Sequence, residues 1–467
     1  MTQASAPLTE RKYLLPFVLV TSLFFLWSIG VNLNDVLIPH LKKAFDLTDF
    51  QSSFIQVAFF GGYCLAAFPA GRLMEKIGYK KGILTGLLIC SAGTLLFLPA
   101  ASSRQYGFFL LALFVMSCGQ SFLEVGANPY VTVLGPPETS ARRLNLAQSF
   151  NSVGAVLVLT LGSAFILSGV EHTAAERAAM TPRQVQAYIA SEANLVKVPY
   201  LVITCMFLSV AALIYFAHLP EVGARKTGEN EGAASKGLEP LLSQPHLIKG
   251  VIAQFCYVGA QVGVASFIIR FAKHTMPRTL ESMAAWGSQF LAAHQGDKAA
   301  FVTHLVPDSP EKMAAIFLVA HETGFMLGRF SGSWMMKRVN APQLLSIFAT
   351  GAAIFVLIAI AFSGLISVLA IVVVGFFHSI MFPTIFALSL KNLGKLTKRG
   401  SSLLVMSIIG GALIPALMGK ISDLSNIQKA FTVPLLCYLY VIYFAVHGYK
   451  PNAVSAVAGS SAIAEAE

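Results

Sequence analysis

Charged residues are scarce in this chain. Asp, Glu, Lys and Arg make up only 12% of its 467 residues, against about 25% in an average soluble domain. Hydrophobic residues account for 55% of the chain, and the mean hydropathy is +0.69. This composition excludes an ordinary soluble enzyme and predicts a membrane protein.

The sequence also lacks the common signatures of nucleotide and metal chemistry. We find no P-loop, no HExxH, no GxSxG and no Rossmann fingerprint after a strand. The six cysteines lie in apolar stretches at unrelated spacings, so they predict small buried hydrophobes rather than a disulfide framework or a zinc site. We therefore predict no cofactor, no metal and no catalytic residue, and any work that the chain performs must draw on an ion gradient.

Long apolar stretches, in contrast, recur along the whole chain. A hydrocarbon core about 30 Å thick needs roughly 20 apolar residues per helix. The first stretch is longer than the roughly 7–15 apolar residues of a signal peptide and has no small-x-small cleavage site, so we interpret it as a span. The twelve predicted spans are 13–38, 51–74, 82–100, 105–132, 145–168, 198–218, 248–272, 311–336, 342–363, 365–391, 401–421 and 430–448.

The net charge of +11 is spread over the short loops between spans, so it does not indicate a nucleic-acid binder. With the N-terminus inside the cell, about 20 of the 33 Lys and Arg residues lie on the cytoplasmic side, where basic residues are normally in excess. We therefore expect both termini to be cytoplasmic.

The chain contains an internal repeat. "GRLMEKIGYKKG" begins at Gly71, and "GRFSGSWMMKRV" begins 257 positions later at Gly328. Pro129 and Pro383 repeat at a similar offset of 254. These offsets favour a duplicated six-span unit, and a duplicated bundle points to a site between its copies. We predict bundles over 1–218 and 248–448, a cytoplasmic linker over 219–247 and a disordered cytoplasmic tail over 449–467.

Two long segments face the outside in this topology. Segments 169–197 and 273–310 have helical character in "TPRQVQAYIASEA" and "MAAWGSQFLAAH". We expect short interfacial helices or caps there, without chemistry of their own.

The first copy of the repeated motif joins spans two and three. Its glycines let helices approach closely, and its charges can pair across the cytoplasmic helix ends, as expected of a gate. A simple positive-inside anchor is the alternative. The residues of this gate motif are Gly71, Arg72, Glu75, Gly78, Lys80 and Lys81.

Span one carries Asn32 and Asp35, three residues apart on one helix face. A charge at the centre of a span costs about 2.5–3.5 kcal/mol on insertion scales, so Asp35 should face a cavity or a partner. Because Pro39 and His40 follow closely, the alternative is that Asp35 is simply hydrated near the outer interface.

Span four shows the strongest signal. Gln120, Glu124 and Asn128 recur every four residues and form a polar stripe, with Pro129 loosening the backbone behind it. Because an ionised Glu is expensive there, we expect this carboxyl to be protonated for part of a working cycle, as in a proton-coupling device. A permanently neutral Glu that joins helices by hydrogen bonds is the alternative.

Polar side chains also gather in spans five and seven. Amides offer both donors and acceptors to hydroxyl groups, and aromatic rings stack on the C–H faces of sugars. Any single Gln is more often a helix–helix contact, so only the collection favours a polyhydroxylated ligand. The residues are Asn145, Gln148, Ser149, Asn151 and Ser152 in span five, and Gln254, Tyr257 and Gln261 in span seven.

Span eight adds a titratable pair, His321 and Glu322. Glu322 and Arg329 are two turns apart on one face, so an internal ion pair through a bridging group would fit. We leave functional and structural roles of this pair open, and interpret His378 of span ten as a satisfied bundle residue.

Several motifs together resemble one transporter family. "NLNDVLIP", "PAGRLMEKIGYKKGI", "LEVGANPYVTVLGP", "RLNLAQSFNSVGA", "AQFCYVGAQ", "FPTIFALSLKNLG" and "GSSLLVMSIIGGA" are similar to motifs of the fucose–galactose–glucose proton symporter family, within the major facilitator superfamily, and most of all to its L-fucose-transporting members. The resemblance covers nearly all of the chain from Tyr13 to Tyr449. It implies an all-α membrane fold with twelve transmembrane helices in two six-helix bundles, alternating access and proton symport.

The resemblance also assigns site residues. The family's carboxylates in spans one and four match Asp35 and Glu124, and its span-one Asn matches Asn32. In the family the span-four carboxylate is tied to proton coupling and sugar recognition, and the span-one carboxylate is required for transport. Val31 and the pair His321-Glu322 depart from the family pattern and leave the hexose and the stoichiometry open.

We therefore expect a monomeric, proton-coupled symporter in a bacterial inner membrane that imports a hexose, with L-fucose preferred. Protonation of Glu124 would let the bundles rock, with sugar held by Asn32, Asp35, Gln148 and the span-seven amides. Its partners would be a sugar, a proton and the lipid bilayer, and no nucleic acid.

Two alternatives stay open at this point. One is a glucose- or galactose-selective, or sodium-coupled, member of the same family. The other is a multispanning enzyme that acts on a lipid-linked sugar, which would need a cluster of carboxylates in a surface loop. The loops of this chain offer no such cluster.

Overall fold

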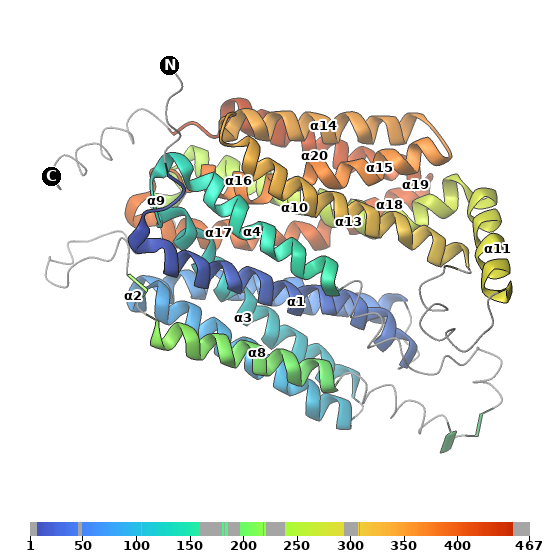
Figure 1. Ribbon diagram of the computed structural model, residues 1–467, viewed down its shortest axis with the longest axis horizontal. Coiled ribbons are helices and arrows are strands. Elements are labelled where there is room, and N and C mark those ends of the chain that lie inside the picture. Colours follow the sequence, from blue (N-terminus) through green and yellow to red (C-terminus); the bar gives the residue numbers. More distant parts are fainter. Residues whose placement is uncertain are drawn as a thin grey trace, which may run out of the picture. The chain divides into compact units, whose positions relative to one another are not determined.

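The computed structural model describes residues 7–44, 49–103, 105–158, 180–181, 183–184, 197–217, 219–220, 239–293, 307 and 309–451. For residue 31 and for residues 33–44 and 49–53 it describes the course of the chain only. Every regular element in these ranges is a helix (Figure 1).

Helices of the first half of the chain follow the predicted spans closely. They are α1 (Leu14–Ala44), α2 (Asp49–Ser103), α3 (Tyr106–Val133), α4 (Ser140–Leu157) and α8 (Lys197–Phe216), with short turns of helix at η1 (Arg11–Tyr13), η2 (Pro137–Thr139) and α9 (Glu239–Leu242). The long α2 is two helices joined at Gly78, whose φ of 83° and ψ of 173° are not helical. This break separates the two spans predicted over 51–74 and 82–100, so both predictions are confirmed as helices.

The second half contains more interruptions. Its elements are α10 (Pro245–Thr275), α11 (Pro277–Ala293), α13 (Pro310–Met335), α14 (Ala341–Ala361), α15 (Leu365–His378), α16 (Met381–Ser389), η4 (Gly394–Leu396), α17 (Thr397–Met406), η5 (Ser407–Ile409), α18 (Gly410–Leu424), α19 (Ile427–Ala430), α20 (Thr432–Tyr443) and η6 (Phe444–Gly448). The spans predicted over 365–391 and 401–421 are each divided between two helices, α15 with α16 and α17 with α18.

Nine helical stretches of the described residues are long and apolar enough to cross a membrane, and one of them contains the Gly78 break. Spans predicted over 145–168 and 311–336 correspond to α4 and α13, which are not among these nine. Residues 159–168 lie outside the described residues.

The chain forms two compact units. Unit 1 comprises Met1–Val251, Phe386–Ile409 and Lys450–Glu467, and unit 2 comprises Ile252–Ile385 and Gly410–Tyr449. Unit 1 thus includes α17, which packs against α2 and α3 although it lies late in the sequence. The predicted bundles over 1–218 and 248–448 stay a prediction, as does the linker over 219–247, of which only residues 219–220 and 239–247 are described.

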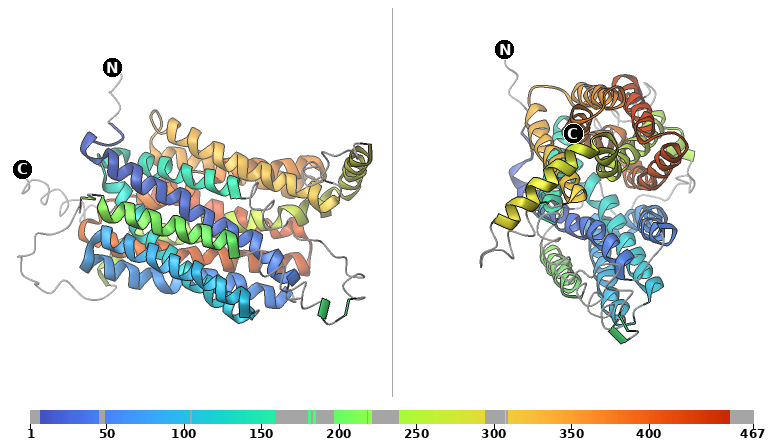
Figure 2. Two further views of the ribbon diagram at one scale, coloured as in Figure 1. Left: turned by 60° about the horizontal axis from the view of Figure 1, so that its bottom comes forward. Right: turned by 90° about the vertical axis from the view of Figure 1, so that its right-hand side faces the viewer.

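Glycines bring helices of unit 1 into backbone contact. A Cβ on Gly93 of α2 would lie 2.4 Å from the backbone nitrogen of Met116 in α3, and one on Gly119 would lie 2.4 Å from that of Cys90. No larger residue fits at either position without moving a helix. Close packing of this kind holds helices together in lipid, where the hydrophobic effect does not, and α2, α3 and α8 run side by side in both views of unit 1 (Figures 1 and 2).

Candidate functional site

The predicted polar stripe is present on α3. Gln120 and Asn128 are fully buried, and Glu124 is only 8% exposed. All three belong to the continuous buried stretch Gly119–Val131 of this helix. The structure therefore places a carboxyl group between two amides, away from water.

Tyr63 of α2 joins this stripe, which the sequence analysis missed. Its hydroxyl donates to Gln120 Oε1 at 3.3 Å. Ser121 Oγ donates to the Tyr63 carbonyl at 2.9 Å and so fixes this part of α2 against α3. A polar-tipped aromatic in the apolar run "FFGGYC" was the available signal.

Gln148 of α4 contacts the other end of the stripe. Its Nε2 donates to Asn128 Oδ1 at 2.9 Å. Asn128 Nδ2 and Gln120 Nε2 are both buried and have no hydrogen-bond partner among the described residues. The stripe thus presents amide donors one turn before and one turn after Glu124.

Helix α1 borders the same cluster. A Cβ on Gly30 would lie 3.0 Å from Gln120 Nε2, so this glycine makes room for the amide. Asn32 is half-buried and donates from Nδ2 to the Ser28 carbonyl of its own helix at 2.8 Å. Asp35 lies in α1, but its side chain is outside the described residues.

Contacts between α1 and α4 fix this border. Ser28 Oγ donates to the Asn151 carbonyl at 2.6 Å, and Asn151 Nδ2 donates to the Phe24 carbonyl at 3.1 Å. Asn145 Nδ2 donates at 2.9 Å to the Ala141 carbonyl one turn earlier in α4. Gln148 of span five therefore reaches the α3 stripe, whereas Asn151 ties α4 to α1.

The candidate residues of α10 fall in unit 2. Gln254 and Tyr257 are fully buried, and Gln261 is half-buried. The Tyr257 hydroxyl donates to the His378 carbonyl at 3.0 Å, whereas neither amide atom of Gln254 has a hydrogen-bond partner among the described residues. The structure therefore gives Tyr257 a structural contact and leaves the Gln254 amide available.

Residues of α13 converge on the interruption between α15 and α16. Arg329 is 4% exposed, donates from Nε to the Ser379 carbonyl at 3.1 Å and lies over the Phe325 ring. His321 Nδ1 lies 3.0 Å from the Ile371 carbonyl, and the His321 and His378 ring centroids are 5.7 Å apart. Nε2 of His378 bonds with the Tyr438 hydroxyl. Glu322 is half-buried on the same helix and interacts electrostatically with Arg329.

The gate motif contacts α17 within unit 1. Arg399 Nε lies 2.8 Å from both carboxylate oxygens of Glu75. Lys398 Nζ donates to the Met74 carbonyl at 3.0 Å and lies over the Tyr79 ring. Both cations lie in the first turn of α17, within "KLTKRG", a basic stretch that the sequence analysis did not pair with the motif.

Other members of the gate motif have separate roles. A Cβ on Gly71 would lie 2.9 Å from Ser402 Cβ, so this glycine permits the approach of α17. Lys80 Nζ donates to the Tyr215 and Ala217 carbonyls at the end of α8, at 2.9 and 2.8 Å. Arg72 lies over the Phe68 ring, and Lys81 is exposed.

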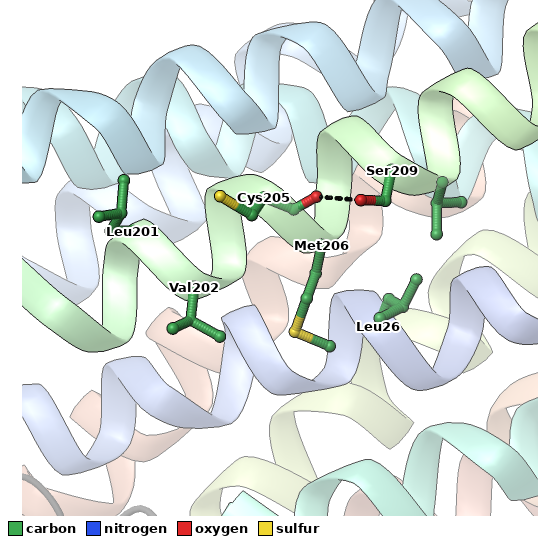
Figure 3. Close-up of a pocket in the computed structure, with 7 residues that line it drawn as sticks. Leu26, Leu201, Val202, Cys205, Met206 and Ser209 are labelled. Atoms are coloured by element: carbon green, nitrogen blue, oxygen red, sulfur yellow. Dashed lines mark hydrogen bonds between the residues drawn. The ribbon is translucent and has the colours of Figure 1, made fainter.

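A groove between α1 and α8 does not suit a polar ligand. It has a volume of about 460 Å³, and its one hydroxyl, Ser209 Oγ, already donates to the Cys205 carbonyl at 2.7 Å (Figure 3). Its lining residues are Leu26, Leu201, Val202, Cys205, Met206, Ser209 and Val210. The buried polar stripe, rather than this apolar groove, is therefore the candidate site. No group of three His, Cys, Asp or Glu residues suited to a metal occurs in the described part of the chain.

Comparison with known proteins settles the family. The profile of the major facilitator superfamily matches residues 20–415. The chain belongs to this superfamily. An L-fucose-proton symporter of Escherichia coli (strain K12) is 40% identical over 93% of this chain and 93% of its own length. A glucose/galactose transporter of Brucella abortus is 38% identical over 95% of this chain and 96% of its own length.

Structural comparison agrees with this membership. A solved structure of a major facilitator superfamily transporter, FucP, in the outward conformation has a TM-score of 0.80 and 39% identity, over 93% of this chain and 99% of that one. The predicted fold and family are therefore confirmed, and the chain is a multi-pass membrane transporter of the major facilitator superfamily. The alternative of a membrane enzyme is excluded, because the family and these relatives are transporters.

Proposed function

We propose that this transporter imports a hexose together with a proton across the bacterial inner membrane, with L-fucose as the first candidate. One observation carries the proposal: Glu124 is a buried carboxyl group between two amides in the middle of α3. The names of its relatives, which include an L-fucose-proton symporter and glucose/galactose transporters, support the substrate class.

Burial explains why Glu124 would couple proton and sugar. A carboxylate in a low-dielectric interior is strongly disfavoured unless it is paired, whereas the protonated acid is neutral and can donate a hydrogen bond. Uptake of one proton therefore changes both the charge and the hydrogen-bonding capacity of the stripe. If the state that binds the proton also binds the sugar better, the two ligands move together.

The amides around Glu124 supply the chemistry for a sugar. Gln120 Nε2 and Asn128 Nδ2 are buried donors without partners in the described structure. Sugar hydroxyls accept such bonds, and a buried donor that gains a partner recovers about 1–3 kcal/mol. Asn32, Asp35 and Gln148 are further candidates in unit 1, and Gln254, Tyr257 and Gln261 are candidates in unit 2.

The contacts of α17 suggest how the cycle is gated. Glu75 and Met74 of α2 bind Arg399 and Lys398 of α17. In alternating access, one side of a transporter closes while the other opens. We interpret these contacts as part of a cytoplasmic closure that must separate when the transporter opens inward.

The deciding experiment replaces Glu124 by Gln in proteoliposomes. Gln keeps the size and hydrogen bonding of a protonated Glu but cannot release a proton. We expect exchange of labelled sugar across the membrane to continue while accumulation driven by a pH gradient is lost. Glu239→Gln, at an exposed carboxylate, is the matched control and should behave as wild type. Uphill accumulation with normal proton flux in Glu124→Gln would contradict the proposal.

Substrate and ion are tested separately. Competition of labelled L-fucose uptake by unlabelled hexoses distinguishes an L-fucose transporter from a glucose/galactose transporter. Uptake at fixed pH in sodium-free buffer distinguishes proton from sodium coupling, since only a sodium-coupled protein would stop. If the protein is monomeric in these vesicles, as we also propose, the fraction of vesicles that transport at low protein-to-lipid ratio should match random loading of single chains.

A further inference from the structure

Helix α11 has an aromatic edge that the transport mechanism does not use. Trp286 is 65% exposed and Met283 is 38% exposed. The Trp286 ring stacks on Phe290 with centroids 5.8 Å apart and an interplanar angle of 27°. These three residues follow one another at helical steps of three and four, so they form one stripe. We call Met283, Trp286 and Phe290 the aromatic edge.

The neighbouring face of α11 is buried against unit 2. Leu280, Ala284 and Gly287 are buried at steps of four and three. A Cβ on Gly287 would lie 2.0 Å from the Pro307 carbonyl oxygen and 3.5 Å from Met313 Cε, so α11 touches the segment that leads into α13. The aromatic edge therefore lies beside a fixed contact and cannot turn inward without breaking that contact.

Covalent continuity places α11 at a membrane surface. α10 ends at Thr275 and α11 begins at Pro277, while α13 begins at Pro310. Helices α10 and α13 are spans of a membrane transporter, and an ion pair between Lys273 and Glu311 joins their ends. α11 runs across these ends rather than alongside the spans (Figures 1 and 2). Along the membrane normal, α11 therefore lies at the boundary between hydrocarbon and water.

The opposite end of α13 carries a comparable group. Trp334 is 56% exposed, one residue before the end of α13, and Arg338 lies over its ring at 5.5 Å. The 26 residues of α13 span about 39 Å, which exceeds a hydrocarbon core of about 30 Å. Trp286 and Trp334 thus mark two levels about one membrane apart, as Trp residues at the two interfaces do.

We propose that α11 is an interfacial helix whose aromatic edge inserts among lipid headgroups and upper acyl chains, anchoring unit 2 to the membrane surface. Its exposed polar face, which includes Arg278, Glu281 and Ser282, then faces water. A helix with one apolar and one polar face lies in the plane of the interface in this way. By the distribution of basic residues, this is the outer surface. The proposal does not depend on the sugar or on the coupling ion.

Tryptophan fluorescence tests the proposal directly, because the chain has only three Trp residues. The double variant Trp27→Phe/Trp334→Phe leaves Trp286 as the only Trp. In phosphatidylcholine vesicles, its fluorescence should be largely lost to a spin label near the lipid headgroup, and much less to a label near the acyl-chain end. Iodide added to the water should quench it weakly.

Matched variants show what each result means. A protein with only Trp27, which is 3% exposed, should resist both lipid labels and iodide. A protein with only Trp334 should respond to the headgroup label as Trp286 does. If replacing Trp27 impairs folding, Trp286→Phe in the otherwise natural chain should remove part of the lipid-quenchable fluorescence. Strong iodide quenching of Trp286 without lipid quenching would show a hydrated helix, and shielding from both would show cover by another chain. Either result overturns the proposal.

Discussion

The buried polar groups around Glu124 in unit 1 and around Arg329 in unit 2 have different partners. In unit 1, Glu124 lies between amides whose donors at Gln120 and Asn128 have no partner in the described structure. In unit 2, Arg329 and Tyr257 donate to the backbone carbonyls of Ser379 and His378, where α15 gives way to α16. The set around Glu124 keeps amide donors without a partner in the described structure, whereas Arg329 and Tyr257 satisfy the protein's own backbone.

This difference follows from the helices that carry each set. Helix α3 is unbroken from Tyr106 to Val133, so most of its backbone groups bond within the helix. The Val125 carbonyl, which Pro129 cannot satisfy, accepts from Ser401 Oγ at 3.0 Å. The tenth span is interrupted between His378 and Met381, which releases carbonyl groups that must find donors in a nonaqueous environment. We infer that proton coupling is carried out by side chains of unit 1. The buried donors of unit 2 serve to satisfy the backbone carbonyls that the interruption of the tenth span releases.

The largest loss of stability should come from Arg329→Met, which tests the structural role of the unit 2 donors. The change removes a charged donor from the Ser379 carbonyl and a cation from the face of Phe325, and should lower stability by about 2–3 kcal/mol. Thermal unfolding in detergent measures it. Lys337→Met, at an exposed lysine of the same motif, is the control and should change stability by less than about 0.5 kcal/mol. If Arg329→Met were fully stable yet unable to accumulate sugar, unit 2 would hold coupling chemistry after all.

Asn128→Ala should have the next largest effect, on sugar binding and also on stability, because Gln148 Nε2 loses its acceptor. Loss of one donor to a hydroxyl should weaken sugar binding roughly tenfold, which is about 1.4 kcal/mol. Sugar binding to the purified protein by calorimetry measures it. Ser149→Ala is the control, because Ser149 Oγ donates to the Asn145 carbonyl of its own helix.

Gln254→Leu extends this test to unit 2. Since neither Gln254 amide atom has a partner in the described structure, its removal should not lower stability. Weakened sugar binding in Gln254→Leu would identify Gln254 as a sugar ligand from unit 2. If Asn128→Ala bound sugar normally while Gln254→Leu bound it weakly, the sugar ligands would belong to unit 2 and not to unit 1.

Two buried tyrosines allow a smaller, matched comparison. Tyr257→Phe leaves the His378 carbonyl without this donor and should lower stability by about 1 kcal/mol. Tyr63→Phe breaks a longer bond of 3.3 Å to Gln120, so we expect little change in stability. It should instead weaken sugar binding severalfold, because the Gln120 amide loses the group that orients it. Thermal unfolding and calorimetry on both variants separate the two outcomes, and equal losses of stability would contradict the comparison.

The sequence predicted the helices and the α3 stripe because both depend on local spacing. Apolar length predicts a span, and steps of four predict a shared helix face, so Gln120, Glu124 and Asn128 could be grouped without a structure. The break at Gly78 was marked by a glycine between charged residues. The interruption between α15 and α16 was not predicted, because "FFHSIMFP" is apolar on both sides of it.

The spacing of residues along the sequence could not predict contacts between segments that are far apart in the chain. Tyr63 joins the stripe from 57 positions away, and Arg399 reaches Glu75 across 324 positions. Nothing in the local sequence distinguishes Arg399 from the other basic residues of its loop, which are explained equally well by topology. The role of Asp35 is predicted only by the family resemblance, since its side chain lies outside the described residues.

The smallest effect should be the coupling between Glu75 and Arg399. Both side chains are partly exposed, at 25% and 21%, so water screens the ion pair and its coupling energy should be about 0.5–1 kcal/mol. Glu75→Gln, Arg399→Gln and the double variant form a cycle that isolates this energy in thermal unfolding. Lys398 still bonds the Met74 carbonyl in all three variants, so α17 should stay docked on α2. A closure that has to open in every transport cycle should consist of weak contacts of this kind. A coupling above about 2 kcal/mol would mean that the pair is a permanent part of unit 1 instead of a gate.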